Sequence, residues 1–312
     1  MHKLGIGLMA VVIAAFTLNG SAEARGFGDN DNSGYYGQGG QMDKCGGAMD
    51  MGMEMTRGTA QMAVGTGEHW ISWLEFNTGD IPATSEFLHT VFGWDVMPYM
   101  DNYVMWMPSM EKGELGCGIA SNAEIPQQSA FYIYTPNIDA KLAEVEARGG
   151  SVFVPKMPIA EGMPNIAMFT DPSGVIVGLV DAALPAEPVA NPVGPGASGV
   201  PGMFCALEVY NASTSGPDSF YRDLFGWASK PTMESYMDFN PGSGIAGVFQ
   251  SHTAEAKVMA YIWSDDVQAT LDAVEAAGGT TFGEAMSMEN IATFGYFTAP
   301  GGLMLGLMGP AS

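Results

Sequence analysis

The chain has 312 residues, of which 47% are hydrophobic and 11% aromatic, so it can build a substantial core and is not a wholly disordered chain. Eleven lysines and arginines stand against 34 aspartates and glutamates, which gives a net charge of −23. This charge argues against partners such as nucleic acid or an anionic membrane surface. At roughly 100–200 residues per domain, about two domains are expected.

The N-terminus has the pattern of an export signal. Lys3 precedes an apolar run over residues 4–18, and residues 22–24 read Ala-Glu-Ala, a small-x-small cleavage pattern. The run is shorter than the ~20 apolar residues that a membrane-spanning helix needs. We therefore predict that residues 1–24 are a cleaved signal peptide, and that the mature protein is periplasmic or secreted, with no membrane attachment.

Residues 25–67 are rich in Gly, Asn, Gln and Met without an apolar period, which predicts a disordered tail. Within the tail, the segment CGGAMDMGMEM combines a thiol with thioethers, soft donors that suit Cu(I). Copper handling by the tail is one hypothesis, and a flexible linker without bound metal is the simpler interpretation. The candidate copper ligands are Cys45, Met49, Met51, Met53 and Met55.

The remainder of the chain is an internal repeat. The stretch from Trp73 to Trp94 recurs from Ala206 to Trp227, shifted by 133 positions, and the pair Gly149-Gly150 recurs as Gly278-Gly279. We therefore predict two tandem domains, 68–181 and 202–312. The segment 182–201, rich in Pro, Gly and Ala, is the expected linker.

In chain order, each repeat reads as a strand, a helix and three strands, and then the same order again. Alternation predicts strands, a 3.6-residue apolar period predicts helices, and Gly149-Gly150 ends the second helix. This is the α+β class, with two βαβββ modules in each repeat, helices on one face of a mixed sheet and a concave cup on the other. In the first repeat the predicted strands are 71–77, 96–99, 103–107, 115–120, 130–134, 152–154, 166–169 and 175–180, and the helices are 81–92 and 138–148.

The segments WLEFNTGDIPATSEFLHTVFGW and ALEVYNASTSGPDSFYRDLFGW resemble the first strand and helix of the vicinal oxygen chelate superfamily, which includes glyoxalases, bleomycin-resistance proteins and extradiol dioxygenases. AFYIYTPNIDAKLAEVEARGG and MAYIWSDDVQATLDAVEAAGG resemble its middle strand and helix, and DPSGVIVGLV resembles its last strand. Within the superfamily, the chain is most similar to tandem-domain, glyoxalase-like proteins of the 27 kDa antigen type.

The resemblance implies where a metal ion would be held: on the first, middle and last strands of each repeat. No side chain at these positions is an imidazole or a carboxylate, the donors that divalent Fe, Mn, Ni or Zn prefers. We therefore expect a metal-free protein without a cofactor, and neither the metal-dependent isomerisation nor the ring cleavage of the superfamily. The positions are Trp73, Ala130 and Gly178 in the first repeat and Ala206, Met259 and Gly306 in the second.

Strand alternation places Trp73 and Glu75 on one face, and the resemblance implies that this face lines the cup. In the second repeat, Glu208 is expected on the equivalent face. A carboxylate in an apolar concavity can act as a general base or accept a hydrogen bond from a ligand, or it can be held by neighbouring strand groups. Further side chains could contact a flat ligand, or simply pack between strands. These candidates are Trp73, Trp106, Tyr132, Met259, Tyr261 and Trp263.

The leading functional hypothesis is an exported, metal-free, bleomycin-resistance-like protein that encloses a small amphipathic or aromatic molecule. One alternative is a metal-independent lyase, isomerase or hydrolase with Glu75 or Glu208 as general base; as an enzyme it would resemble a glyoxalase-like lyase or a dioxygenase-superfamily member. Another is a structural or partner-binding protein whose cups are filled by its own side chains. We expect a monomer whose tandem domains imitate a dimer, or a homodimer.

Overall fold

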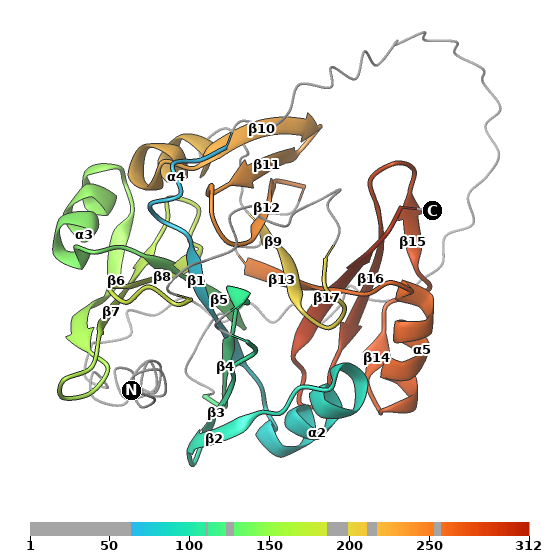
Figure 1. Cartoon of the computed structure of the whole chain (residues 1–312). Coiled ribbons are helices and arrows are strands. Elements are labelled where there is room, and N and C mark those ends of the chain that lie inside the picture. The colour runs from blue at the N-terminus through green and yellow to red at the C-terminus, as the bar shows by residue number, and fades with distance from the viewer. Residues whose placement is uncertain are drawn as a thin grey trace, which may run out of the picture. The chain divides into compact units, whose positions relative to one another are not determined.

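The computed structural model describes residues 64–109, 112–122, 128–185, 199–210, 217–252 and 257–311 (Figure 1). The predicted signal peptide and the candidate copper ligands Cys45, Met49, Met51, Met53 and Met55 lie outside the described residues. Within the described ranges, no helix combines the length and apolar character that crossing a membrane requires.

The first repeat folds into one eight-stranded mixed sheet with two helices. Its strand order is β2-β3-β4-β1-β5-β8-β7-β6, so the two halves of the repeat meet where β1 pairs antiparallel with β5. The elements are β1 (Ile71–Asn77), α2 (Ile81–Phe92), β2 (Met97–Met100), β3 (Tyr103–Trp106), β4 (Cys117–Ala120), β5 (Ser129–Tyr134), α3 (Ile138–Ala147), β6 (Ser151–Pro158), β7 (Asn165–Thr170) and β8 (Ile176–Val180).

The second repeat builds the same sheet, in the order β10-β11-β12-β9-β13-β17-β16-β14, with β15 paired to β16. The predicted α+β class and the order of elements are confirmed. The elements are β9 (Phe204–Tyr210), α4 (Pro217–Phe225), β10 (Ala228–Met233), β11 (Tyr236–Asn240), β12 (Ala246–Gln250), β13 (Lys257–Trp263), α5 (Val267–Ala276), β14 (Thr280–Thr281), β15 (Met286–Met288), β16 (Ala292–Thr298) and β17 (Met304–Gly309).

Local signals in the sequence set the ends of the helices. The Asp80 side chain accepts a hydrogen bond from the Ala83 N–H at 3.0 Å and so caps the start of α2. Gly93 ends this helix with φ 69°, a left-handed conformation that glycine adopts without steric cost. Strand β6 runs to Pro158 rather than to the predicted residue 154. Proline has no backbone N–H, and it is tolerated here because β6 is an edge strand, in which a residue facing solvent needs no partner strand.

The two repeats exchange equivalent contacts. The Trp94 indole N–H donates to the Gly202 carbonyl at 2.8 Å, and the Trp227 indole N–H donates to the His69 carbonyl at 2.7 Å. Helix α2 contacts α5 and helix α3 contacts α4, and each pair lies side by side in Figure 1. Because each pair joins one helix of each repeat, residues of both sheets share one large hydrophobic core.

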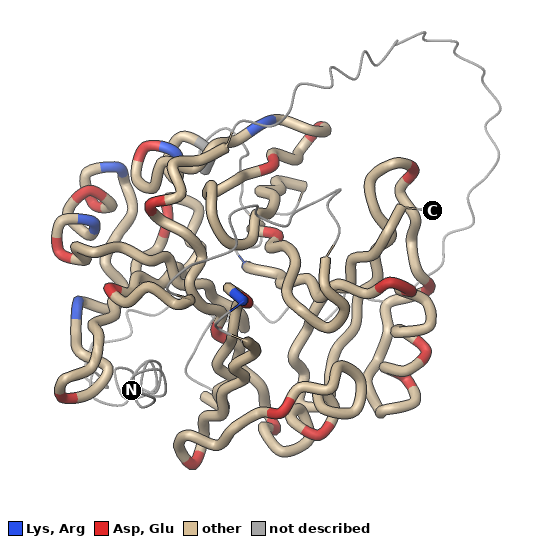
Figure 2. Tube along the Cα trace, viewed as in Figure 1, with Lys and Arg blue, Asp and Glu red and all other residues tan. Residues whose placement is uncertain are grey.

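Charge is unevenly distributed over this framework. Figure 2 shows acidic residues on helices and loops of both repeats, whereas several basic residues gather on the side of α3, α4 and β10. The acidic surface accords with the strong net negative charge of the chain.

Candidate functional site

The concave face of each sheet is best described in rows of side chains that lie opposite one another on paired strands. In the first sheet Trp73 pairs with Tyr132, and Tyr132 pairs with Gly178. Ala130, predicted at the middle position, pairs instead with Glu75. The middle-strand position in this row is therefore Tyr132, two residues further along β5, because the register of an antiparallel pair cannot be read from single strands.

The same correction applies to the second sheet. Tyr261, rather than Met259, pairs with both Ala206 and Gly306, while Met259 pairs with Glu208. The two rows that would hold a metal ion therefore read Trp73, Tyr132, Gly178 and Ala206, Tyr261, Gly306.

These two rows do not fit a divalent metal ion. A Cβ at Gly178 would stand 2.1 Å from the ring of Tyr132, and a Cβ at Gly306 would stand 2.5 Å from the ring of Tyr261. The tyrosine rings thus occupy the space that a ligand side chain from the last strand would need. Burial raises the pKa of both tyrosines well above its ordinary value, so they stay neutral phenols, which are poor metal ligands. No group of three His, Cys, Asp or Glu side chains with metal-binding geometry occurs among the described residues.

We call the concave face around Glu75 the first cup. The Tyr103 hydroxyl donates to Glu75 Oε2 at 3.0 Å, and burial raises the pKa of this carboxyl to about 8. The Trp73 indole lies close enough to Glu75 to favour the charged carboxylate. Neither the indole N–H nor Glu75 Oε1 has a hydrogen-bond partner within the described part of the chain. Trp73, Tyr103 and Tyr132 are all at most 1% exposed. The first cup is thus filled by its own side chains.

We call the concave face around Glu208 the second cup. Tyr261 donates its hydroxyl to Glu208 Oε2 at 2.5 Å, and Tyr210 donates to the same oxygen at 3.3 Å. The hydroxyls of Tyr261 and Tyr296 lie 3.2 Å apart, which extends the network. Burial raises the pKa of Glu208, while its hydrogen bonds and nearby His252 and Lys257 act in the opposite direction.

Two substitutions between the repeats explain why the cups differ. Ala206 stands where the first repeat has Trp73, which removes an indole from the front of the carboxylate. Val248 pairs with Glu208 as Gly118 pairs with Glu75. At Gly118 a Cβ would stand 1.8 Å from the Tyr103 hydroxyl, so glycine is what lets Tyr103 reach Glu75.

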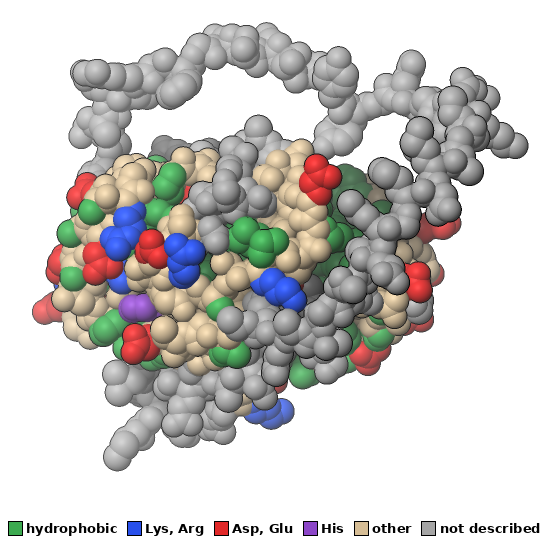
Figure 3. Space-filling model, turned by 90° about the horizontal axis from the view of Figure 1, so that it is seen from above, with side chains coloured by type: hydrophobic (Ala, Val, Ile, Leu, Met, Phe, Trp, Pro, Cys, Tyr) green, Lys and Arg blue, Asp and Glu red, His purple; other side chains and the backbone are tan. Residues whose placement is uncertain are grey.

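In the second cup, the residue equivalent to Tyr103 is Tyr236. It is half-buried, and its ring lies 5.4 Å from that of His252. Partly buried apolar side chains complete the wall: Ile291, Phe294 and Met304. Figure 3 shows a hollow floored by hydrophobic side chains on the face seen from above, in the half that holds β15 and β16. The second cup therefore combines buried polar groups with accessible apolar surface.

A second carboxylate shares this face. Asp238 pairs with Val248, which pairs with Glu208, so the two acids stand in one row with a valine between them. Burial raises the pKa of Asp238 to about 6. The analogous residue of the first repeat is Met105, which pairs with Gly118.

The structure brings some of the predicted residues together and separates others. Glu75, Trp73 and Tyr132 lie in or beside the apolar cluster of the first cup, and Glu208, Met259, Tyr261 and Trp263 lie in or beside that of the second. The placement of Trp106 was wrong: it pairs with Cys117 on the opposite face and stacks on Trp94 at 3.9 Å. Alternation along β3 places Tyr103 and Met105, not Trp106, on the concave face.

Sequence reasoning missed five side chains around Glu208: Tyr210, Tyr236, Asp238, His252 and Tyr296. Alternation from Glu208 would have found Tyr210, because residues two apart on a strand share a face. The others lie on neighbouring strands or loops, and their proximity depends on sheet order.

No family model matches the chain. It is 24% identical over 261 residues to the proteins named "Putative glyoxylase CFP32" of Mycobacterium bovis and of Mycobacterium tuberculosis, and the match covers 77% of this chain and 94% of theirs.

Solved structures with the same fold include a glyoxalase and a dioxygenase. The Mn(II)-bound glyoxalase from Novosphingobium aromaticivorans matches with a TM-score of 0.57 and 14% identity, covering 78% of this chain and 82% of that one. The 2,3-dioxygenase LapB from Pseudomonas sp. KL28 matches with a TM-score of 0.56 and 10% identity, covering 78% and 92%. The resemblance drawn from the sequence is confirmed.

Proposed function

We propose that this tandem member of the vicinal oxygen chelate superfamily binds a small, partly apolar molecule in its second cup and uses no metal ion there. The observation that carries the proposal is the pair of replacements, Ala206 for Trp73 and Val248 for Gly118, which leaves Glu208 beside accessible apolar surface. Concave, mostly apolar sites with a few convergent polar groups are typical of small-molecule binding.

The described side chains divide the work of recognition. Phe294 and Met304, both partly buried, offer contact area to an apolar or aromatic body. The half-buried hydroxyls of Tyr236 and Tyr296 can donate to or accept from a polar group of the ligand. Tyr210 and Tyr261 donate hydrogen bonds to Glu208, so the carboxylate and these two phenols fix one another in position.

The test reproduces the closed first cup in the second. In Ala206→Trp, the indole should occupy the second cup and abolish the fluorescence gain of Nile red, a neutral polarity-sensitive dye. Trp73→Phe in the first cup is the matched control and should leave dye binding unchanged. Thermal unfolding confirms that both variants fold. Unchanged dye binding in Ala206→Trp would place the binding site elsewhere.

Metal independence is tested on the same preparation. The protein purified without chelators should contain far less than one equivalent of Fe, Mn, Ni or Zn by elemental mass spectrometry, and EDTA should leave Nile red binding unchanged. One equivalent of any of these metals, lost in Glu208→Gln, would overturn the metal-free part of the proposal.

Export is part of the proposed function, and it is supported by the sequence of residues 1–24. The mature protein should begin at Arg25 and appear in the periplasmic or extracellular fraction. Intact-mass measurement of that fraction tests the cleavage site, and a full-length chain found only in the cytoplasm would contradict it.

A second candidate function is acid–base catalysis by Glu208. It is favoured by the burial that raises the pKa of this carboxyl, because a raised pKa suits a carboxyl that transfers a proton near neutral pH. Proton exchange of hydroxyacetone in D2O, followed by NMR, is a suitable probe. The wild type should accelerate exchange in the presence of EDTA, and Glu208→Gln should not; equal rates with and without the protein would leave binding alone.

A further inference from the structure

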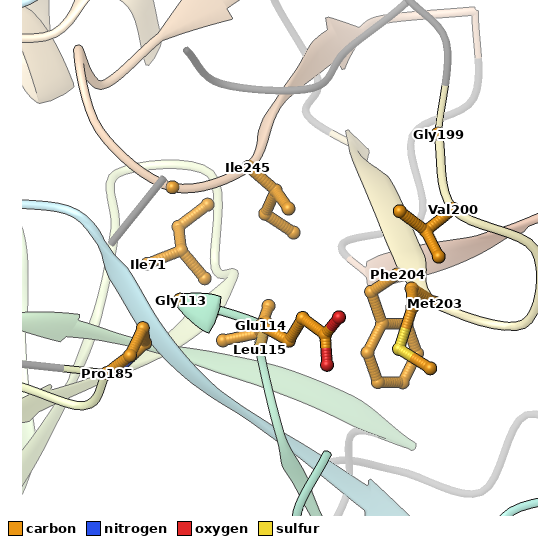
Figure 4. Close-up of a pocket in the computed structure, with 11 residues that line it drawn as sticks. Ile71, Gly113, Glu114, Leu115, Pro185, Gly199, Val200, Met203, Phe204 and Ile245 are labelled. Atoms are coloured by element: carbon orange, nitrogen blue, oxygen red, sulfur yellow. The ribbon is translucent and has the colours of Figure 1, made fainter. Parts of the chain in front are cut away.

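A second cavity lies between the two repeats, apart from either cup (Figure 4). Its volume is about 80 Å³, and it is partly open to solvent. This is several times the ~10–15 Å³ that one water molecule needs, so the cavity has room for a small ligand. Its walls come from both repeats and from three residues of the predicted linker, Pro185, Gly199 and Val200.

Equivalent residues form the two apolar walls. Ile71 and Leu115 of the first repeat correspond to Phe204 and Ile245 of the second, and all four side chains are buried. The Phe204 ring also contacts the rings of Trp94 and Trp106, at centroid distances of 5.1 and 5.9 Å. The walls are therefore supported by the shared core, so the cavity is held open by rigid elements.

One charged side chain breaks this equivalence. Glu114 lines the cavity, whereas the corresponding residue of the second repeat is Gly244. The Ser109 backbone N–H donates to Glu114 Oε2 at 2.9 Å and holds the carboxylate in place. Figure 4 shows this carboxylate extending into the space between Leu115 and Met203. No Lys, Arg or His is among the described residues that line the cavity.

We propose that this cavity between the repeats is a separate binding site for a small organic cation, with the apolar body of the ligand between the two walls and its ammonium group on Glu114. A carboxylate beside apolar walls favours a ligand that carries one positive charge and one apolar group. The net charge of −23 adds a long-range attraction for cations. The single carboxylate gives the ligand one orientation.

The experiment compares two probes of similar shape, phenethylamine, which is a cation at pH 7, and neutral 2-phenylethanol. Binding is followed by isothermal titration and by intrinsic tryptophan fluorescence, to which Trp94 and Trp106 beside Phe204 contribute. Phenethylamine should bind about tenfold more tightly, because a hydrogen bond to a charged partner is stronger than one to a neutral partner. Equal affinities of the two probes would overturn the proposal.

Three variants locate the site. Glu114→Gln should weaken phenethylamine about tenfold and leave 2-phenylethanol unchanged. Glu161→Gln, an exposed residue with the same change in net charge, is the matched control and should bind both probes like the wild type. Ala206→Trp, which blocks the second cup, should leave phenethylamine binding intact; loss of binding there would assign the amine to the cup and refute a separate site.

Discussion

Gly178→Ala tests the arrangement that excludes a metal ion from the first cup. The added methyl group would stand 2.1 Å from a ring carbon of Tyr132, which is fully buried and cannot move into solvent. The backbone of Gly178 lies outside the left-handed region, so alanine itself is compatible with this position. The whole cost must then come from the contact with the ring.

The magnitude follows from two opposing effects. Overpacking a well-packed core costs about 1–3 kcal/mol. Replacing glycine by alanine at a compatible position stabilises by about 0.4–1 kcal/mol, because the unfolded chain loses freedom. The free energy of unfolding should therefore fall by about 1–2 kcal/mol, measured by urea denaturation.

A double-mutant cycle identifies the cause. Tyr132→Ala removes the ring, so in that background Gly178→Ala should be neutral or stabilising, which gives a coupling energy of about 2 kcal/mol. Gly306→Ala with Tyr261→Ala repeats the cycle in the second cup, where the added methyl would stand 2.5 Å from the ring. A coupling energy below about 0.5 kcal/mol in both cycles would refute the claim that the rings fill these positions.

Three further predictions concern the frame around the cups. The pKa of Glu75 in the folded protein, about 8, is higher than in the unfolded chain. The stability that Glu75 contributes through its bound proton is therefore complete below about pH 4.5 and is lost as the pH rises towards 8. Glu75→Gln should remove this loss. In urea denaturation, the unfolding free energy of the variant relative to the wild type should therefore rise from pH 5 to 8, and a constant difference over this range would contradict the assignment. Gly279→Ala, whose Cβ would stand 2.7 Å from Val274 Cγ1 and 2.9 Å from the Phe87 ring, should lower the unfolding free energy by about 1–2 kcal/mol by chemical denaturation, and no loss would mean that these side chains have room to move. Trp94→Phe and Trp227→Phe should each cost about 1–3 kcal/mol in the same assay, since each leaves a carbonyl of the other repeat without its donor; a loss in only one of them would show that the two contacts are not equivalent.

The order of elements could be predicted from the sequence because its signals are local and occur twice. Asp80 caps a helix, Gly93 ends it, and alternation marks β1, so each element is defined within about a dozen residues. The repetition supported each assignment, because the second repeat shows the same pattern as the first.

The candidate site was predicted only in part, because it depends on relations between strands. Glu208 was found by alternation along one strand, but Tyr236 and Tyr296 were missed because they lie on strands that are distant in sequence. Trp106 was misplaced because β3 is buried on both faces, so its apolar sequence does not show which of its side chains lie on the concave face. The openness of the second cup rests on Val248, whose role appears only when it is compared with Gly118 across the paired strands.

The repeated Gly-Gly pair has a meaning that spans both repeats. In each copy the first glycine has a left-handed φ, 86° at Gly149 and 87° at Gly278, which ends a helix. The second glycine lies beside an aromatic ring of the other repeat, Phe220 for Gly150 and Phe87 for Gly279.

The contacts between the two halves of the chain are thus reciprocal. The ring of one half fits against the glycine of the other, and each tryptophan donates to a carbonyl beyond its own sheet. A half expressed alone would expose both members of these pairs at once, so we expect it to pair with a second copy of itself about a twofold axis. The covalent link allows each repeat to change its own cup while these shared contacts are kept.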